Sequence, residues 1–218
     1  MVRIPLAKYG VREVLLFGGI SLVGAALSAI LLWYLTPLFV LTAVGVLYFF
    51  RDPSRRTPAE PHVLVAPADG RVVEVAEVEE PEFLSALAHK IAIFMSPLDV
   101  HVNRAPCDGR VETLVHRPGR HLNASTADAS SRNEASAMTL THVDGDARVL
   151  VRQVAGAVAR RIVCAAVVGQ RLRRGDRYGM IKFGSRAEVY VPVESGFKVE
   201  VRLGQTVRAG ETILGRFR

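Results

Sequence analysis

The sequence predicts a mainly β fold, a sandwich or barrel-like domain, preceded by an N-terminal hydrophobic helical hairpin. No charged residue occurs from Val14 to Phe50. After residue 61 the chain consists of short runs rich in valine and isoleucine, many of them separated by turn signals such as ADG, CDG and ESG. Strong helical periodicity is absent from this second part, beyond a possible turn at 82–90.

The uncharged N-terminal run is too long for a single membrane helix. As one straight helix, residues 14–50 would extend about 55 Å, against a hydrocarbon core of about 30 Å. Thr36-Pro37 is the expected break, because proline lacks an N–H and disfavours helix at the residue before it. We therefore expect helices at roughly 14–34 and 38–50. The second is short for a full span, and is either a tilted crossing or a re-entrant arm.

Basic residues flank this run on both sides, and such flanks tend to stay cytoplasmic. A hairpin satisfies both flanks, and it would leave the rest of the chain on the cytoplasmic side of the cell membrane. Trp33 and Tyr34 would then lie near the far interface. A cleaved signal peptide is disfavoured, because its apolar region spans only about 7–15 residues. The basic flanking residues are Arg3, Lys8 and Arg12 before the run, and Arg51, Arg55 and Arg56 after it.

The formal net charge of +7 favours an anionic partner, either nucleic acid or an acidic membrane surface. The apolar run favours the membrane, where each nearby basic residue adds about 1 kcal/mol of attraction. No aromatic stacking platform accompanies the arginines, so nucleic acid is not an expected partner. Cys107 and Cys164 are isolated and form no metal-type pair, so we expect buried apolar thiols, with a disulfide left open.

We expect three parts: a membrane-associated hairpin at 1–50, a proline-rich linker at 51–61, and a β-rich domain at 62–218. Within the last part, 195–214 resembles the hammerhead of biotinyl and lipoyl carrier domains, a likeness of fold more than of chemistry. The expected strands are 63–66, 71–78, 90–95, 110–116, 138–143, 147–154, 160–168, 187–193 and 197–203.

The stretch GDRYGMIKFGSRAEVYVP (175–192) places Gly184-Ser185 between two strand-like runs. Alone, a Gly-Ser pair is most often a tight turn. In this β framework, however, the F-G-S-R run resembles the processing site of phosphatidylserine decarboxylases of the short, single-domain subfamily. The resemblance covers most of the chain through YFFRDPSR (48–55), VLVAPADGRV (63–72), FMSPLDVHVNRAP (94–106), HLNASTADASSRNE (121–134), QVAGAVARRIV (153–163) and GDRYGMIKFGSR (175–186).

This resemblance implies an enzyme that decarboxylates phosphatidylserine in an anionic membrane to phosphatidylethanolamine. Loss of carbon dioxide from an amino acid leaves a carbanion, and a cofactor carbonyl that forms a Schiff base provides the electron sink. In the family the chain makes this carbonyl itself. The Ser185 hydroxyl attacks the Gly184 carbonyl, and elimination from the ester leaves a pyruvoyl group, derived from Ser185, as the covalent cofactor. Chains 1–184 and 185–218 would then form a heterodimer.

A serine hydroxyl is a weak nucleophile that needs a base or an oxyanion stabiliser. The family pattern places Asp69, in PADG, and His101, in PLDVHVNR, beside the cleavage site. By themselves, Asp69 is more often a turn residue, and His101 is equally typical of a core. Many longer relatives have a second histidine where this chain has Arg104, so a triad that uses that histidine does not carry over. The base stays open between His101, another group such as His116, and the strained backbone.

A membrane-anchored carrier domain of biotinyl or lipoyl type is the alternative. Lys182, in GMIKFG, would be the modified lysine at a hairpin tip. Ile181 and Phe183 occupy the positions where such domains carry methionines. A carrier domain would also leave much of the chain unexplained.

Overall fold

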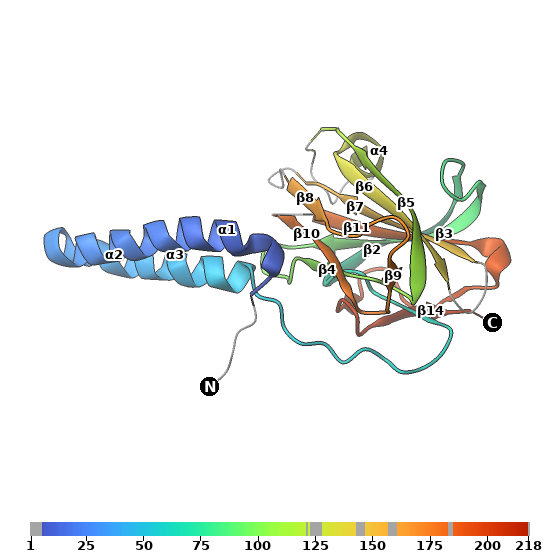
Figure 1. The fold of residues 1–218 in the computed structure, drawn as a ribbon, viewed down its shortest axis with the longest axis horizontal. Helices are drawn as coiled ribbons and strands as arrows, with labels where there is room; N and C mark the ends of the chain where they lie inside the picture. Colours follow the sequence, from blue (N-terminus) through green and yellow to red (C-terminus); the bar gives the residue numbers. More distant parts are fainter. Residues whose placement is uncertain are drawn as a thin grey trace. The chain divides into compact units, whose positions relative to one another are not determined.

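In a computed structural model the 218-residue chain forms two compact units, residues 1–54 and 55–218. The boundary between them falls inside the predicted linker, 51–61. The first unit is helical and the second is mainly β, as predicted (Figure 1). The structure describes residues 6–120, 122, 128–142, 147–156, 161–182 and 185–217.

The helical unit reverses direction at Leu32, whose φ of −146° and ψ of 62° lie outside the helical region. The predicted break at Thr36-Pro37 is therefore wrong by four residues. Pro37 lies in the first turn of the second helix, where its missing N–H has no intrahelical partner to lose. The segments are a 3₁₀ turn (Lys8–Gly10), α1 (Val11–Glu13), a π turn (Val14–Gly18), α2 (Gly19–Leu31), a 3₁₀ turn (Trp33–Leu35) and α3 (Thr36–Phe49).

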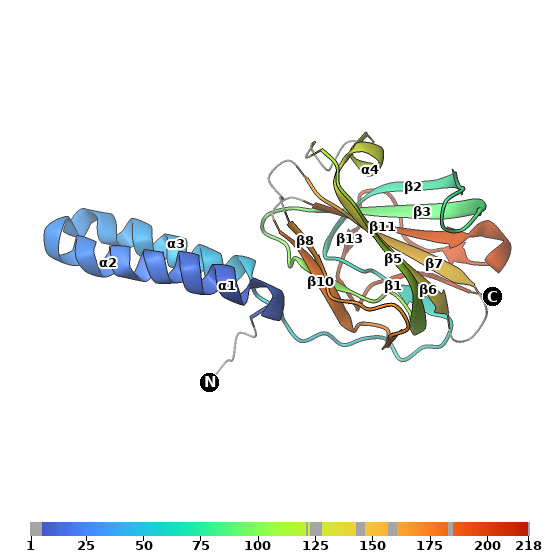
Figure 2. The same ribbon diagram turned by 45° about the horizontal axis from the view of Figure 1, so that its top comes forward.

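Helices α2 and α3 lie side by side along their length (Figures 1 and 2). Gly24 permits this approach, because a Cβ there would lie 2.5 Å from the ring of Phe39. At the base of the hairpin, the Ala7 N–H donates to the carbonyl of Phe50 at 2.8 Å. The two arms of the predicted hairpin therefore contact each other along their length and again where the chain enters and leaves the hairpin.

The hairpin exposes most of its large apolar side chains. Leu15 is 70% exposed and Ile30 is 82% exposed. The continuous helical stretch Lys8–Leu31 is long and apolar enough to cross a membrane, and Trp33–Phe49 is a shorter apolar helix. An apolar surface of this kind is typical of contact with lipid.

The strands of the second unit form three antiparallel sheets in the part of the chain that the structure describes. Their orders are β1-β14-β12, β4-β10-β8 and β13-β2-β3-β11-β7-β6-β5-β9. The eight-stranded sheet curls into a half-barrel (Figure 2). The strands are β1 (Val63–Val65), β2 (Gly70–Glu80), β3 (Ala86–Met95), β4 (Val102–Arg104), β5 (Gly109–Arg117), β6 (Ala135–His142), β7 (Arg148–Val154), β8 (Arg161–Cys164), β9 (Arg171–Leu172), β10 (Arg177–Lys182), β11 (Ser185–Pro192), β12 (Lys198–Val199), β13 (Thr206–Val207) and β14 (Ile213–Arg216).

Most of the predicted strands are present, but some differ in extent. The run 197–203 pairs only at Lys198–Val199, and the run 160–168 only at Arg161–Cys164. The possible turn at 82–90 ends before Ala86, where β3 begins, and β4 and β9 lie outside the predicted runs. The C-terminal part has the short strands and glycine turns of the predicted hammerhead, with φ of 83° at Gly204 and 74° at Gly210. A short helix, α4 (Asp128–Arg132), lies within the motif HLNASTADASSRNE (121–134).

Strand β11 lies inside the large sheet. It pairs with β3 over eight residues and with β7 over five. The main hydrophobic core packs against one face of this strand, through Ala187, Val189 and Val191. Alternation along a strand sends its other residues to the opposite face, which carries charged side chains.

Candidate active site around Ser185

Ser185 is the first residue of β11 and is completely buried. It pairs with Met95 at the end of β3, and its hydroxyl donates to the Met95 sulfur at 3.2 Å. A thioether is a weak acceptor, so the hydroxyl is oriented without being held in a strong hydrogen bond. The predicted cleavage partner, Gly184, lies outside the described residues.

His101 is completely buried and immediately precedes β4. Its Nδ1 lies 2.9 Å from the backbone carbonyl of Asp99, an acceptor. Nδ1 therefore carries the proton of the neutral ring, and Nε2 carries the lone pair. The His101 carbonyl accepts the N–H of Ile181 at 3.3 Å. This bond ties His101 to β10, the strand that precedes Ser185 in the chain.

Asp69 lies in the turn between β1 and β2. One carboxylate oxygen pairs with Arg55 at 2.7 Å, and the other accepts the N–H of Ala209 at 2.8 Å. These bonds hold the PADG turn against the C-terminal part of the domain. Neither bond joins Asp69 to His101 or Ser185, so the role of Asp69 at the cleavage site stays a prediction.

Arg104 stands where the resemblance to longer relatives implied a second histidine. It is buried, and its guanidinium donates to the carbonyl of Gly175 at 3.0 Å, so it supports a neighbouring turn. His116, another candidate base, has a half-exposed ring that lies 3.6 Å from the carboxylate of Glu134. Its exposure separates it from the buried environment of Ser185.

Two buried amides complete the surroundings of Ser185. Gln153, on β7, pairs with Ala187 of β11, and residues that pair across two strands lie on the same face of the sheet. Ser185 is two positions before Ala187 and shares that face, so Gln153 lies on the Ser185 side of the sheet. Its Nε2 donates to Oδ1 of Asn103 at 2.8 Å. Asn103 Nδ2 in turn lies 3.9 Å from the same Met95 sulfur that Ser185 contacts.

Asn103 and Gln153 lie in two of the family-like motifs, 94–106 and 153–163, but their sequence context indicates no role for either. The available signal is their place in the strand pattern. Each is a polar residue at a buried position of a strand: Asn103 is completely buried and Gln153 is 1% exposed. The two residues lie in different sheets, Asn103 on β4 and Gln153 on β7, so only the packing of these sheets shows that they meet.

The opposite face of β11 carries a buried ionic cluster around Glu188, whose side chain is 0% exposed. Glu188 accepts hydrogen bonds from Tyr190 at 2.8 Å and from Ser130 of α4 at 3.0 Å. It also pairs with Arg186 at 2.7 Å, and Arg186 pairs with Glu74 on β2. Residues that alternate with Ser185 and Ala187 therefore hold β11 by charge.

Two further cations extend this cluster. Lys90 lies 3.8 Å from Glu188 and 3.0 Å from Glu74, and Arg152 lies 3.8 Å from Glu188. Burial alone would raise the pKa of Glu74, but Lys90 and Arg186 lower it overall. Burial, with the Glu188 carboxylate nearby, raises the pKa of Tyr190, so its phenol stays a donor.

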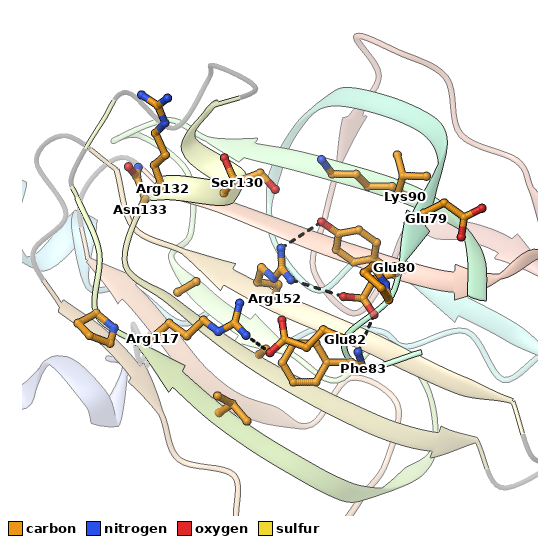
Figure 3. Close-up of a pocket in the computed structure, with 18 residues that line it drawn as sticks. Glu79, Glu80, Glu82, Phe83, Lys90, Arg117, Ser130, Arg132, Asn133 and Arg152 are labelled. Carbon is orange, nitrogen blue, oxygen red and sulfur yellow. Dashed lines mark hydrogen bonds and ion pairs between the residues drawn. The ribbon is translucent and has the colours of Figure 1, made fainter. Parts of the chain in front are cut away.

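A cavity of about 430 Å³ lies on this ionic face (Figure 3). In it Arg152 points to Tyr190 and Glu80, and Arg117 pairs with Glu82. Cations and carboxylates lining the cavity thus largely pair with each other. The side chain of Ser185 belongs to the other face of β11, so this cavity is separate from its surroundings.

Comparison with known proteins agrees with the motif order. A family model described as phosphatidylserine decarboxylase matches residues 43–215. Relatives named phosphatidylserine decarboxylase proenzyme include one from Salinibacter ruber, 48% identical over 83% of this chain and 80% of the relative. The relative from Syntrophotalea carbinolica is 44% identical over 97% of this chain and 96% of its own length. One from Desulfotalea psychrophila is 39% identical over 98% of this chain and 97% of the relative.

The carrier-domain alternative finds no support. Lys182 lies within β10 and is 5% exposed. A lysine that carries a swinging cofactor must be accessible, so this environment does not suit it. The match to the decarboxylase model also covers most of the chain that a carrier domain would leave unexplained.

Proposed function

Because this chain belongs to the phosphatidylserine decarboxylase family, we propose that it converts Ser185 to a pyruvoyl group and uses that group to make phosphatidylethanolamine. One observation carries the proposal: a completely buried serine begins a central strand, within FGSR, in a chain whose relatives are named proenzymes. The pyruvoyl group would supply a carbonyl that accepts the electron pair left by the departing carbon dioxide.

The residues around Ser185 fit such a group. Its neighbours on the same face of β11 are Ala187 and Val189, both completely buried, so bulk water is excluded. A carbonyl in a site of low polarity needs a hydrogen-bond donor, and the Nδ2 amide of Asn103 is a donor nearby. No charged side chain is bonded to Ser185 in the described part of the chain.

The proposed cleavage is intramolecular. As the Ser185 hydroxyl loses its proton, Oγ attacks the carbonyl carbon of Gly184, and the peptide C–N bond breaks to leave an ester and a free amine. Loss of the α-proton of residue 185 then expels the Gly184 carboxylate. The resulting enamine takes up water and releases ammonia. Chain 1–184 would end in a carboxylate and chain 185–218 would begin with the pyruvoyl group.

We assign proton transfer to His101. The hydrogen bond from Nδ1 to the Asp99 carbonyl fixes the proton of the neutral ring on Nδ1, so Nε2 is the nitrogen that can accept a proton. Such a group suits both removal of the serine proton and delivery of a proton to the product carbanion. The contacts of Asp69 with Arg55 and Ala209 support an indirect role, in which it fixes the PADG turn.

The same fold supports an association of the two product chains. Strand β11 would belong to the small chain, and both its partners, β3 and β7, would belong to the large chain. Extraction of the small chain would break both ladders of hydrogen bonds. A heterodimer that survives cleavage is the expected state.

The apolar hairpin supports attachment to a membrane that contains phosphatidylserine, with the β domain on the cytoplasmic side. The protein should stay with membranes in high salt. Membrane-impermeant labelling of a single cysteine placed in the linker 51–61 tests the side. Labelling of intact cells from outside would contradict a cytoplasmic domain.

Intact mass and gel electrophoresis of the purified full-length protein test the cleavage. We expect chains 1–184 and 185–218, with the small chain blocked at its N-terminus and reactive with hydroxylamine. Ser185→Ala should remain one chain and release no carbon dioxide from labelled phosphatidylserine. A wild-type protein that stays a single chain with an intact Ser185 would overturn the proposal.

Two further variants separate the roles of the nearby groups. His101→Ala should slow cleavage or turnover by about 10²–10⁴-fold, the usual cost of losing a positioned acid–base group. Asp69→Asn should weaken the turn by breaking the pair with Arg55, and it should lower activity less. Normal cleavage and turnover in His101→Ala would remove this residue from the site.

A further inference from the structure

Two fully buried amides beside Ser185 are incompletely satisfied. Among the described residues, Oε1 of Gln153 has no hydrogen-bond partner. The acceptor of Asn103 Nδ2 in the described part of the chain is the Met95 sulfur, 3.9 Å away. Buried polar groups normally find good partners, and exceptions in native proteins point to a functional role.

The neighbours of Gln153 determine which way both amides face. Gln153 Nε2 lies 3.4 Å from the Val163 carbonyl, an acceptor, so this end of the side chain must be the N–H₂ group. The atom of Asn103 that faces it must then be the acceptor Oδ1. Nδ2 of Asn103 is consequently the atom directed to Met95.

The fold makes room for this arrangement at Gly179 of β10. A Cβ at this position would lie 2.9 Å from Gln153 Nε2 and 2.2 Å from the Val163 carbonyl oxygen. Any larger residue would displace the amide. The pair is therefore accommodated by a glycine of a third strand.

Two donors meet at one weak acceptor. The Ser185 hydroxyl and the Asn103 amide both approach the Met95 sulfur, at 3.2 and 3.9 Å. A carbonyl oxygen is a much better acceptor than a thioether. If residue 185 gains a carbonyl, it loses its own donor and supplies the acceptor that Asn103 lacks.

We propose that Asn103 is a catalytic residue that donates from Nδ2 to the carbonyl of the pyruvoyl group at residue 185, and that Gln153 is the positioning residue that holds Asn103 in this orientation. This inference rests on the proposed conversion of Ser185. The hydrogen bond polarises the carbonyl and would stabilise the negative charge that its oxygen gains as the substrate amine attacks, before that oxygen leaves as water in Schiff-base formation. In the precursor the Met95 sulfur is the weak acceptor that faces Asn103 Nδ2.

The test measures the reactivity of the carbonyl separately from turnover. Cleaved protein is treated with phenylhydrazine, and the rate of hydrazone formation is measured per pyruvoyl group, counted by mass. Asn103→Ala should react about 10-fold more slowly, and kcat on phosphatidylserine vesicles should fall about 10²-fold with little change in KM, as expected for loss of one preorganised donor.

Gln153→Glu keeps the shape of the side chain and tests positioning. At neutral pH its carboxylate cannot donate to Asn103 Oδ1, so hydrazone formation should slow as in Asn103→Ala. At acidic pH the protonated carboxyl regains an O–H donor, and the rate relative to wild type should recover. A purely structural role for Gln153 gives no such recovery.

Thr139→Val is the matched control, because it removes a partly buried hydrogen bond between the hydroxyls of Thr139 and Thr113, 2.6 Å apart, on strands away from Ser185. It should leave the phenylhydrazine rate unchanged. An uncleaved wild-type chain overturns both the proposed function and this inference. A cleaved wild type whose Asn103→Ala or Gln153→Glu variant reacts at the wild-type rate at neutral pH overturns this inference alone.

Discussion

The two faces of strand β11 are equally buried and chemically opposite. On one face lie Ser185, Ala187 and Val189, and on the other lie Arg186 and Glu188, all of them at most 1% exposed. Both faces are covered, one by the hydrophobic core and the other by Ser130 of α4 and the long side chains of Lys90 and Arg152. Burial therefore does not separate reactive from structural residues in this strand.

Hydrogen bonding does separate them. On the Ser185 face, the serine hydroxyl and the Asn103 amide share a single weak acceptor, the Met95 sulfur. On the other face, Glu188 is surrounded by donors, including Tyr190 at 2.8 Å and Arg186 at 2.7 Å. The Ser185 face keeps neutral polar groups available for chemistry, whereas ion pairs on the other face, such as Arg186 with Glu188, fix the strand in place.

Removal of the centre of the ionic face should have the largest effect on folding. Glu188→Leu removes a carboxylate that faces the buried cations Arg186 and Lys90. Because these cations then lack part of their compensating charge, we expect the free energy of unfolding to fall by about 3–5 kcal/mol. Urea titration in a Ser185→Ala background, which remains one chain, measures this loss without interference from cleavage.

The control for this prediction is Glu112→Gln, which breaks an exposed pair with Arg148 at 3.1 Å. An exposed pair contributes about 0–1 kcal/mol. Equal effects of Glu188→Leu and Glu112→Gln would show that the ionic face does not hold β11.

Two buried tyrosines, Tyr190 and Tyr178, should differ in how much their hydroxyl groups contribute to stability. Tyr190→Phe removes a hydroxyl that donates to Glu188, so the free energy of unfolding should fall by about 1–2 kcal/mol. Tyr178 is also buried, but its hydroxyl has no hydrogen-bond partner among the described residues. Tyr178→Phe should therefore be neutral or slightly stabilising. Thermal unfolding of both variants tests this order, and an equal loss in the two would contradict it.

The smallest expected effect concerns pH. Because Lys90 and Arg186 hold the pKa of Glu74 below its ordinary value of 4.5, its ionised form stabilises the fold at higher pH. This contribution should be fully present above about pH 4.5 and should be lost as pH falls through the lowered pKa.

Glu74→Gln removes the titrating group, so unfolding should depend less steeply on acid in that range. Glu77→Gln, which alters a partly exposed carboxylate 3.5 Å from His89, is the control. The measurement is the midpoint of urea unfolding at a series of acidic pH values. Identical slopes for wild type and Glu74→Gln would contradict the lowered pKa.

The sequence by itself determined the features that depend on neighbouring residues. An uncharged run predicted an apolar hairpin, alternating valines predicted most strands, and the order of motifs around His101 and Ser185 indicated the family. Local signals were less reliable at boundaries. The helical break lies at Leu32, because a proline at Pro37 can begin a helix as readily as end one.

Tertiary structure alone decided which distant side chains meet. Gln153 and Asn103 are 50 residues apart and join beside Ser185, whereas Asp69 is held by Ala209, 140 residues away. Sequence spacing cannot predict such contacts, because they follow from how the strands pair and how the sheets and turns pack together. A shift of one residue in the pairing of β7 with β11 would send Gln153 to the ionic face and Arg152 to Ser185.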